Sequence, residues 1–464
     1  MQHLGTLTIA NRKIYNFDFD PTGNFLFLIT EHDLVITTCS NFELLGIIQP
    51  PTQSPIAIFN FCAAWNIALL TTQNTIWIYS IISGRLLIRI GSPDFDSCTG
   101  ATFSADGRFL ATVFNDGNYK LYKISPSLDT EIPPQDAVLK IDNYNFPQII
   151  NSNKYLNFDL ISEEHYEQAI VSVSFSSGCE LIALGFENGK AVIRSTESQP
   201  PRQWLIEAYA SNSEVSIYFN PHNSLSFMTS GQKTGQIDFY TLIKNQRQQK
   251  KKNEDSDADC YRTFKVENRL RIVTSDFNCD GTILFGASTK KLFAWRTDDG
   301  TVINKMEFEQ NVEIDCFNQV LPSMIIPEMA LIIAKSSLWT WNCYTNEIHS
   351  IVIQGYHDPL FQYRLWFKSK TAMIKMNTGA INIYGCENQK WNIEEINIDQ
   401  YQGQYSDKIK NMLHEYEVNQ LHRNMQIYEK RALQYFSEGY VAPDLRSSSD
   451  FDAGEFGFYG KKYK

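Results

Sequence analysis

Short runs of alternating apolar and polar residues follow one another along most of the chain, separated by tight turns. Residues 103–123, FSADGRFLATVFNDGNYKLYK, contain two apolar runs, a turn with Asp116-Gly117, and a third run that ends on an aromatic residue. An Asp-Gly pair tolerates the positive φ that a tight hairpin turn needs, and the alternation buries one side of each strand. This pattern predicts antiparallel strands joined by hairpins.

The same layout recurs along the chain. The closing runs are LVIT (34–37), IWIY (76–79), YKLY (119–122), AVIR (191–194), IDFY (237–240), LFAW (292–295), LWTW (338–341) and INIY (381–384). Their last residues lie 42, 43, 72, 46, 55, 46 and 43 positions apart. Most of these gaps match the period of about 40 to 46 residues of a four-stranded propeller blade, and the two long gaps contain insertions.

This layout resembles the WD-repeat β-propeller family over residues 4–398. The family's repeat tryptophan is matched by aromatic residues at the ends of six closing runs: Tyr79, Tyr122, Tyr240, Trp295, Trp341 and Tyr384. Thr37 and Arg194 stand at the other two ends, and no run ends in a Trp-Asp pair or follows a Gly-His pair. The family's Asp–His hydrogen-bond network is therefore in doubt, and we expect apolar packing between sheets to carry more of the stability. A β-sandwich is the rival fold, but it does not require a period near 43.

Eight repeat units can be counted, and a ring of seven blades is the alternative if the first or the last unit is not a blade. A closed ring has no exposed strand edges at its ends, so one further segment has to complete the last blade. Two segments compete for that place, LGTLTI (4–9) and WNIEEINI (391–398). The propeller is expected to span residues 1–398.

Two insertions interrupt the repeats, at about 126–167 and at 244–260. The first contains AVLKI (137–141), which suits the outer strand of a blade, and the rest of it is expected to lie on the propeller or on a partner. The second changes from basic to acidic along its length. We interpret it as a solvated loop, with a nuclear-localisation patch or an electrostatic docking loop as alternatives.

The pattern changes to helical spacing after the ring. Residues 399–440 are predicted to form an amphipathic helix, and residues 441–464 a flexible tail that keeps several aromatic residues. Such a helix can pack on the propeller, pair with itself or bind a different protein, and the tail is either a docking peptide or an ordinary disordered end. The candidate partner-binding residues are Tyr416, Leu421, Met425, Tyr428, Tyr435, Phe451, Phe456, Phe458 and Tyr459.

Composition narrows the chemistry. The net charge of −11 argues against general nucleic-acid binding, because phosphate contact needs clustered cations. Nine cysteines without a CxxC pair argue against structural zinc, and we expect most of them to be buried as small apolar residues. Motifs of nucleotide-binding loops, metalloproteases and serine hydrolases are missing, so no catalytic residue, metal ligand or cofactor is expected. Neither a membrane-spanning apolar run nor a secretory signal is recognisable.

The resemblance implies a non-catalytic scaffold that belongs to a multi-protein assembly. Partners are expected to be other proteins, docked through propeller loops and through the C-terminal helix and tail, without membrane insertion or a small-molecule ligand. The expected location is cytoplasmic, in a ciliary or cytoskeletal assembly. The alternatives are a propeller that reads a modified peptide or a small ligand in its central channel, and a scaffold subunit of a nuclear chromatin-modifying complex.

Overall fold

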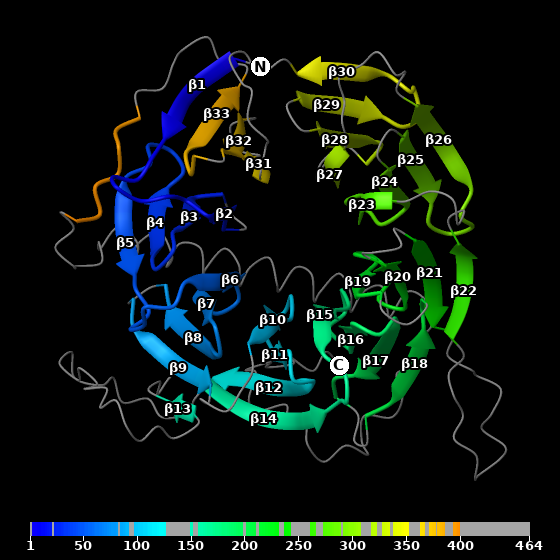
Figure 1. Cartoon of the computed structure of the whole chain (residues 1–464), viewed down its shortest axis with the longest axis horizontal. Coiled ribbons are helices and arrows are strands. Elements are labelled where there is room, and N and C mark those ends of the chain that lie inside the picture. Colours follow the sequence, from blue (N-terminus) through cyan, green and yellow to red (C-terminus); the bar gives the residue numbers. More distant parts are fainter. Residues whose placement is uncertain are drawn as a thin grey trace, which may run out of the picture. The chain divides into compact units, whose positions relative to one another are not determined.

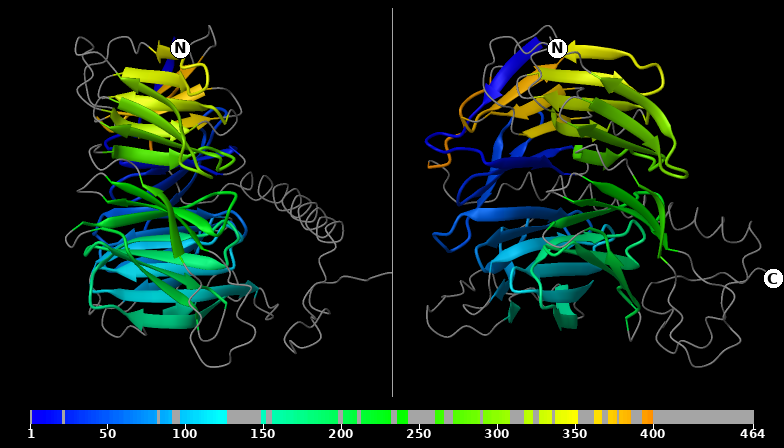
Figure 2. Two further views of the ribbon diagram at one scale, coloured as in Figure 1. Left: turned by 90° about the vertical axis from the view of Figure 1, so that its right-hand side faces the viewer. Right: turned by 45° about the vertical axis from the view of Figure 1, so that its right-hand side comes forward.

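The computed structural model is an all-β ring of antiparallel sheets (Figure 1). The structure describes residues 2–20, 23–81, 84–91, 97–126, 149–151, 156–197, 201–209, 213–231, 236–242, 260–265, 272–288, 291–307, 317–322, 327–334, 337–351, 362–366, 371–376, 378–385 and 393–399. Within these ranges every regular element is a strand. In the side view the strands run from one face of the ring to the other, so the connections between them lie on the two faces (Figure 2).

Eight sheets follow one another around the ring, and we number them as blades 1 to 8 in chain order. The innermost strands are β2 (Asn16–Phe19), β6 (Ile56–Cys62), β10 (Cys98–Phe103), β15 (Ile170–Phe175), β19 (Val215–Phe219), β23 (Ile272–Phe277), β27 (Phe317–Pro322) and β31 (Gln362–Trp366). The second strands are β3 (Phe25–Ile29), β7 (Ile67–Thr72), β11 (Phe109–Phe114), β16 (Leu181–Phe186), β20 (Ser226–Gly231), β24 (Ile283–Ser288), β28 (Met329–Ala334) and β32 (Thr371–Lys375).

The third strands are β4 (Leu34–Thr38), β8 (Thr75–Ser80), β12 (Asn118–Pro126), β17 (Lys190–Ser195), β21 (Ile237–Leu242), β25 (Lys291–Arg296), β29 (Ser337–Asn342) and β33 (Ile381–Gly385). The outer strands are β5 (Leu44–Ile48), β9 (Leu86–Gly91), β14 (Leu156–His165), β18 (Gln203–Glu207), β22 (Cys260–Lys265), β26 (Val302–Glu307), β30 (Ile348–Ile351) and β1 (Gln2–Leu7). The eight closing runs of the sequence are thus the third strands, and their six terminal aromatic residues are all buried. The predicted propeller is confirmed.

The ring is closed by its first strand. β1 pairs antiparallel with β33 and so becomes the outer strand of blade 8, which confirms eight blades and the role of residues 4–7. The competing segment does not take the outer position. Its residue Ile396 forms a parallel bridge with Ile9 just beyond β1.

Apolar side chains fill the spaces between neighbouring blades. One cluster joins blades 2 and 3 through residues such as Ile78 and Leu110, and another joins blades 8 and 1 through Ile383 and Leu28. Five of the second strands, β3, β7, β11, β16 and β24, are buried along their whole length, because each lies in the middle of a sheet that is covered on both faces. The predicted packing between sheets is confirmed.

Buried polar residues fasten the turns after the inner strands. In four of the blades the first residue of this turn is Asp, Ser or Asn, and its side-chain oxygen accepts the N–H of the first residue of the second strand. The pairs are Asp20 with Phe25 (2.7 Å), Ser104 with Phe109 (2.9 Å), Ser176 with Leu181 (3.1 Å) and Asn278 with Ile283 (3.0 Å). These bonds give each hairpin a fixed geometry, since the buried backbone groups of a turn need partners.

The same turns also link neighbouring blades by hydrogen bonds. The links are Trp65 Nε1 to Gly107 O (2.8 Å), Asn220 Nδ2 to Gly281 O (2.7 Å) and Asn278 Nδ2 to Pro327 O (3.1 Å). Gly281 has a φ of 68°, and a Cβ there would lie 2.1 Å from Asn220 Oδ1, so only glycine fits. Side chains of one hairpin therefore hold the next one in place.

Arg194 shows how blade 4 manages without a terminal aromatic residue. Its guanidinium is fully buried and lies over the ring of Tyr119 in blade 3, with Cζ 4.9 Å from the ring centroid. It also pairs with Glu164 of β14 at 2.6 Å and donates to Ser162 at 3.0 Å. Arginine here supplies both a flat surface and charge-assisted bonds, so an ion pair joins the two blades where an aromatic residue is missing.

Part of the first insertion belongs to the ring. β14 pairs with β12 and is the outer strand of blade 3, so the expectation that AVLKI (137–141) fills this position is wrong. The longer β14 offers more ladder bonds to the nine-residue β12 than a five-residue segment can. β13 (Ile149–Asn151) adds a fifth strand to the edge of blade 2 by pairing with β9. Residues 127–148 lie outside the described residues.

The predicted C-terminal helix (399–440), apart from Asp399, and the tail (441–464) lie outside the described residues, as does the second insertion up to residue 259. Within the part of the chain that the structure describes, no helix is long and apolar enough to cross a membrane.

Replacing Asn278 tests the fastening of the turns. In Asn278→Ala the buried Ile283 N–H and Pro327 O both lose a partner, and leaving such groups unsatisfied costs about 1–3 kcal/mol. We expect the free energy of unfolding to fall by about 2 kcal/mol in urea titrations. Asp298→Ala, at an exposed turn of the same blade, should change it by less than about 0.5 kcal/mol. Equal effects of the two substitutions would contradict the structural role of Asn278.

The unpaired inner edge of the ring carries acidic and amide side chains that cap its backbone. Asn16, Asp18 and Asp276 each accept the N–H of the following residue, at 2.8, 2.9 and 2.8 Å. These N–H groups point away from the second strand, because they alternate with those used in the ladder. Asp276 reaches solvent but is closely surrounded by protein, and this desolvation raises the pKa of its carboxyl to about 6.

Asp276 should make the stability of the ring depend on pH. Its folded-state pKa is raised, so the folded protein binds the proton more tightly than the unfolded chain, and stability is lost as the pH rises through about 6. Asp276→Asn keeps an acceptor for Phe277 and removes the charge. We expect a higher melting temperature than wild type at about pH 7.5, and a difference that vanishes at about pH 4. A difference of the same size at both pH values would refute the assignment.

Candidate interaction site at the ring seam

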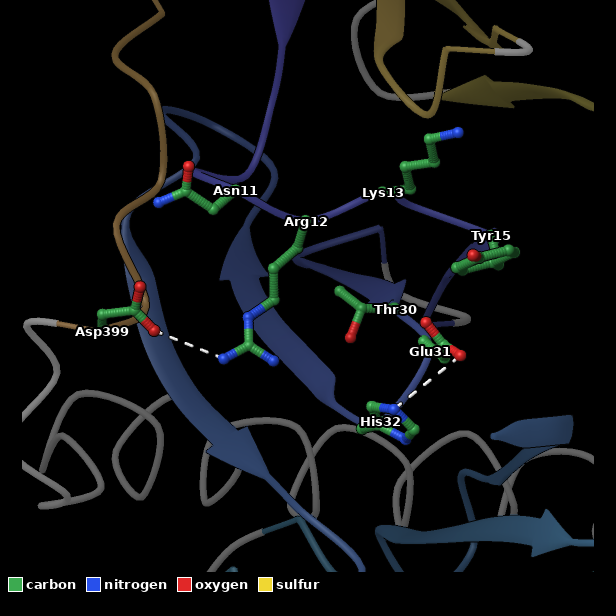
Figure 3. Close-up of a pocket in the computed structure, with 8 residues that line it drawn as sticks. All are labelled: Asn11, Arg12, Lys13, Tyr15, Thr30, Glu31, His32 and Asp399. Atoms are coloured by element: carbon green, nitrogen blue, oxygen red, sulfur yellow. Dashed lines mark hydrogen bonds and ion pairs between the residues drawn. The ribbon is translucent and has the colours of Figure 1, made fainter. Parts of the chain in front are cut away.

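Four segments meet on one face of the ring where blade 8 is closed against blade 1. They are the connection from β1 to β2 (8–15), the turn from β3 to β4 (30–33), the turn from β32 to β33 (378–380) and residues 393–399. The first three share a face because the strands of a meander alternate in direction. We call this place the seam (Figure 3).

Backbone hydrogen bonds hold the connection from β1 to β2 in place. Ile14 N–H donates to Gly379 O at 3.1 Å, and Tyr15 N–H donates to Ile29 O at 2.7 Å. Gly379 has a φ of 87°, and a Cβ there would lie 2.7 Å from the Cβ of Lys13, so the close approach requires glycine. The connection is thereby fixed to both blades that it joins.

Arg12 and Asp33 form the buried centre of the seam. Arg12 Nη1 donates to Asp33 Oδ2 at 2.7 Å, and the Asp33 side chain is only 3% exposed. Thr30 Oγ1 donates to the same carboxylate oxygen at 3.0 Å and accepts the Asp33 N–H at 3.0 Å. A buried carboxylate requires such partners, because desolvation without them is costly. The Arg12–Asp33 ion pair thus links the connection from β1 to β2 to blade 1, in a chain whose sequence lacks the family's Asp–His pattern.

The segment 393–399 packs beside this centre. Ala10 N–H donates to Ile396 O at 2.9 Å, and Ile396 N–H donates to Thr8 O at 3.0 Å. Ile396 and Ile398 are buried in the cluster that joins blades 8 and 1. At the end of the segment Asp399 accepts a hydrogen bond from Arg12 Nη2 at 3.3 Å, and its side chain remains 57% exposed.

Two hollows of about 380 and 520 Å³ lie on either side of the connection and share residues 11–13. The first is also lined by Tyr15, Glu31 and His32, and the second by Glu395 and residues 378–380. Figure 3 shows Arg12 reaching into the first hollow between Asp399 and His32, while Lys13 points in another direction. Among the described residues Lys13 forms no ion pair, whereas Glu31 lies 3.9 Å from His32. The seam is therefore a polar, charged surface on a fixed backbone.

Within the described part of the chain, no group of three or more His, Cys, Asp and Glu side chains is arranged to hold a metal ion. Five cysteines are buried free thiols, which confirms the expectation for them: Cys39, Cys62, Cys98, Cys179 and Cys343. Burial raises the pKa of the Cys62 and Cys343 thiols to about 11 and that of Cys98 to about 12. These three thiols are protonated and poorly reactive near neutral pH.

The nine residues predicted to bind partners all lie in 416–459, outside the described residues, and their role stays a prediction. The seam residues were missed from the sequence. Asn-Arg-Lys at 11–13 is an ordinary polar connection between two strands, and nothing near Asp33 marks it as buried. One feature of the sequence did indicate where the seam lies. Residues 4–9 and 391–398 were both candidates for the outer strand of the last blade, which placed both segments near that blade.

No family model matches the chain, and no curated protein sequence does. Among solved structures, Saccharomyces cerevisiae Sqt1 is similar to it, with a TM-score of 0.59 and 9% identity over 84% of this chain and 100% of Sqt1. The chain is a β-propeller. The resemblance to WD-repeat propellers is confirmed for the fold.

Two further structures match this propeller less closely. The β-propeller domain of Myceliophteria thermophila Cps50 (Swd1) has a TM-score of 0.46 and 10% identity, over 83% of this chain and 99% of the domain. A chain of the mitotic checkpoint complex has a TM-score of 0.46 and 9% identity, over 72% of this chain and 87% of that chain.

Replacing Arg12 tests the centre of the seam. Removing one partner of a buried ion pair costs about 3–5 kcal/mol, and we expect about 2 kcal/mol for Arg12→Ala, because the arginine is one-third exposed and water can reach the gap. Urea titration measures this loss. Adding Asp33→Asn to Arg12→Ala should recover part of the stability, since no unpaired charge is then buried.

Lys13→Ala is the matched control for Arg12→Ala. It removes the neighbouring cation, which has no ion pair in the described structure, and should change the free energy of unfolding by less than about 0.5 kcal/mol. If Lys13→Ala and Arg12→Ala destabilise equally, the buried pair is not the element that holds the seam.

Proposed function

We propose that this protein is a non-catalytic interaction scaffold, a structural subunit of a multi-protein assembly. The observation that carries the proposal is the seam. There, four chain segments are fixed by backbone bonds and one buried ion pair, yet Lys13, Tyr15 and Asp399 face solvent. Side chains held in place before binding lose little entropy when a partner docks, which is the condition for an efficient contact surface.

A second support comes from the way the chain leaves the ring. Residues 393–399 are tied to the seam, so whatever follows residue 399 starts from a fixed point beside a docking surface. The predicted helix at 399–440 and the aromatic tail would then act as a second contact tethered close to the first, and linked contacts bind more tightly than either alone. WD-repeat propellers, which the chain resembles in fold, work in such assemblies. We place the assembly in the cytoplasm, with a ciliary or cytoskeletal one as the first case to examine.

The alternative of a reader of modified lysine in the ring centre finds less support. Such a reader needs several aromatic rings around the cation. Among the described inner-strand side chains, Tyr218 is the large apolar one that is strongly exposed. The second alternative, a scaffold subunit of a nuclear chromatin-modifying complex, differs from our proposal in the partner proteins. Purification of the complex would identify them.

Affinity purification of the full chain beside a version ending at Gln400 tests the scaffold. We expect the full chain to recover a stable set of proteins, and the shortened chain to retain those that dock on the ring and to lose those held by the C-terminal region. Mass spectrometry reads out both sets. Recovery of no partner by the full chain would overturn the scaffold function, and identical sets would overturn the role of the C-terminal region.

A further inference from the structure

The two sides of the Arg12 guanidinium differ in how firmly they are held. Nη1 bonds to Asp33 at 2.7 Å inside the protein, where that carboxylate also bonds to Thr30. Nη2 bonds to Asp399 at 3.3 Å at the surface, and Asp399 is more than half exposed. The first bond is part of the fold, because breaking it would bury an unpaired charge. The second is an exposed ion pair of the kind that water and other ions can replace.

The charges around the first hollow favour the exchange of one carboxylate for another. Arg12 and Lys13 supply two positive charges, and Asp33, Glu31 and Asp399 supply three negative ones. An incoming carboxylate that takes the place of Asp399 leaves this sum unchanged when the displaced Asp399 side chain, which is already 57% exposed, turns away into solvent. It can also approach the Lys13 side of the hollow, and the Lys13 ammonium forms no ion pair within the described residues.

We propose that the seam binds an acidic segment of a partner polypeptide, one of whose carboxylates replaces Asp399 on Arg12. This inference deepens the proposed scaffold function and rests on it for the existence of a partner. Arginine suits the exchange, since its planar fork can keep one carboxylate on Nη1 while it receives another on Nη2. Asp399 then acts as an internal stand-in for the partner's acidic residue.

When a partner's carboxylate displaces Asp399 from Arg12, the segment 393–399 loses one of its contacts. Residues 393–399 are held by two backbone bonds with residues 8–10, by Ile396 and Ile398, and by the Arg12 pair. Loss of the pair removes the last of these contacts before residue 400, so the end of the segment loosens. Docking at the seam thereby loosens the root of the C-terminal region, and the two contact surfaces of the scaffold become coupled.

A fluorescein-labelled peptide, Gly-Glu-Glu-Glu-Glu-Gly, tests the exchange by fluorescence anisotropy with the full chain at low salt. In Asp399→Asn the internal competitor is gone, and we expect the peptide to bind about fivefold more tightly than to wild type, the factor that an exposed ion pair supplies. Lys13→Gln should weaken binding several-fold. Lys305→Gln, which removes an exposed lysine from blade 6, should leave it unchanged.

The same peptide with glutamine in place of glutamate separates carboxylate recognition from backbone docking, and we expect it not to bind. Hydrogen exchange of wild type should quicken in 393–399 when the acidic peptide is added, because the segment loosens. Equal affinities of wild type and Asp399→Asn, equal binding of both peptides, or binding that Lys305→Gln weakens as much as Lys13→Gln would each overturn the proposal.

The peptide experiments and the affinity purification can fail independently of each other. If the peptide results hold but the full chain recovers no partner from cells, the seam site stands and the scaffold function fails. If partners are recovered but the peptide results fail, the seam site alone is wrong.

Discussion

Every blade of this protein has two apolar faces, and both have to be covered. A row of blades would leave one face bare at each end, whereas a closed ring covers all of them. Closure depends on β1 and β33, strands that lie at opposite ends of the ring-forming chain and pair as the outer half of blade 8. The remaining features of the seam follow from this pairing. It brings residues 8–15 against blade 1, and residues 393–399 then pack beside them.

Polar contacts join neighbouring blades in this chain, which lacks the Trp-Asp and Gly-His pairs of the repeat family. Arg194 stands where other blades have an aromatic ring, and it joins blade 4 to Tyr119 and Glu164 of blade 3. Arg12 and Asp33 join the closing connection to blade 1. The turn asparagines Asn220 and Asn278 reach carbonyls of the next blade. In these blades a buried polar side chain of the local sequence makes the link to the neighbouring segment, so the links form without the family's repeat motif.

The strands of the fold were predictable because their signal is local. Hairpin turns and the alternation of side chains are set by residues a few positions apart, and the period near 43 is visible in the third strands. The seam was not predictable in the same way. Arg12 meets Asp33 across 21 positions and Asp399 across 387, and no local pattern marks Asp33 as a residue that becomes buried. The error at AVLKI has a similar cause, since two apolar stretches of one insertion were equally suited to pair with β12.

The pairing of β1 with β33 also bears on the order of events during synthesis. Of the strands of the ring, β1 is made before the others, but its partner strand β33 emerges only after the other seven blades have been synthesised. Contacts between residues so far apart in sequence form slowly, and a strand that waits for its partner exposes an unpaired edge. The blades in between can pack as they appear, because each closes mainly on its predecessor. Completion of the ring is therefore the last step in assembling the propeller, and until then the unpaired edge of β1 is open to pairing with a neighbouring chain.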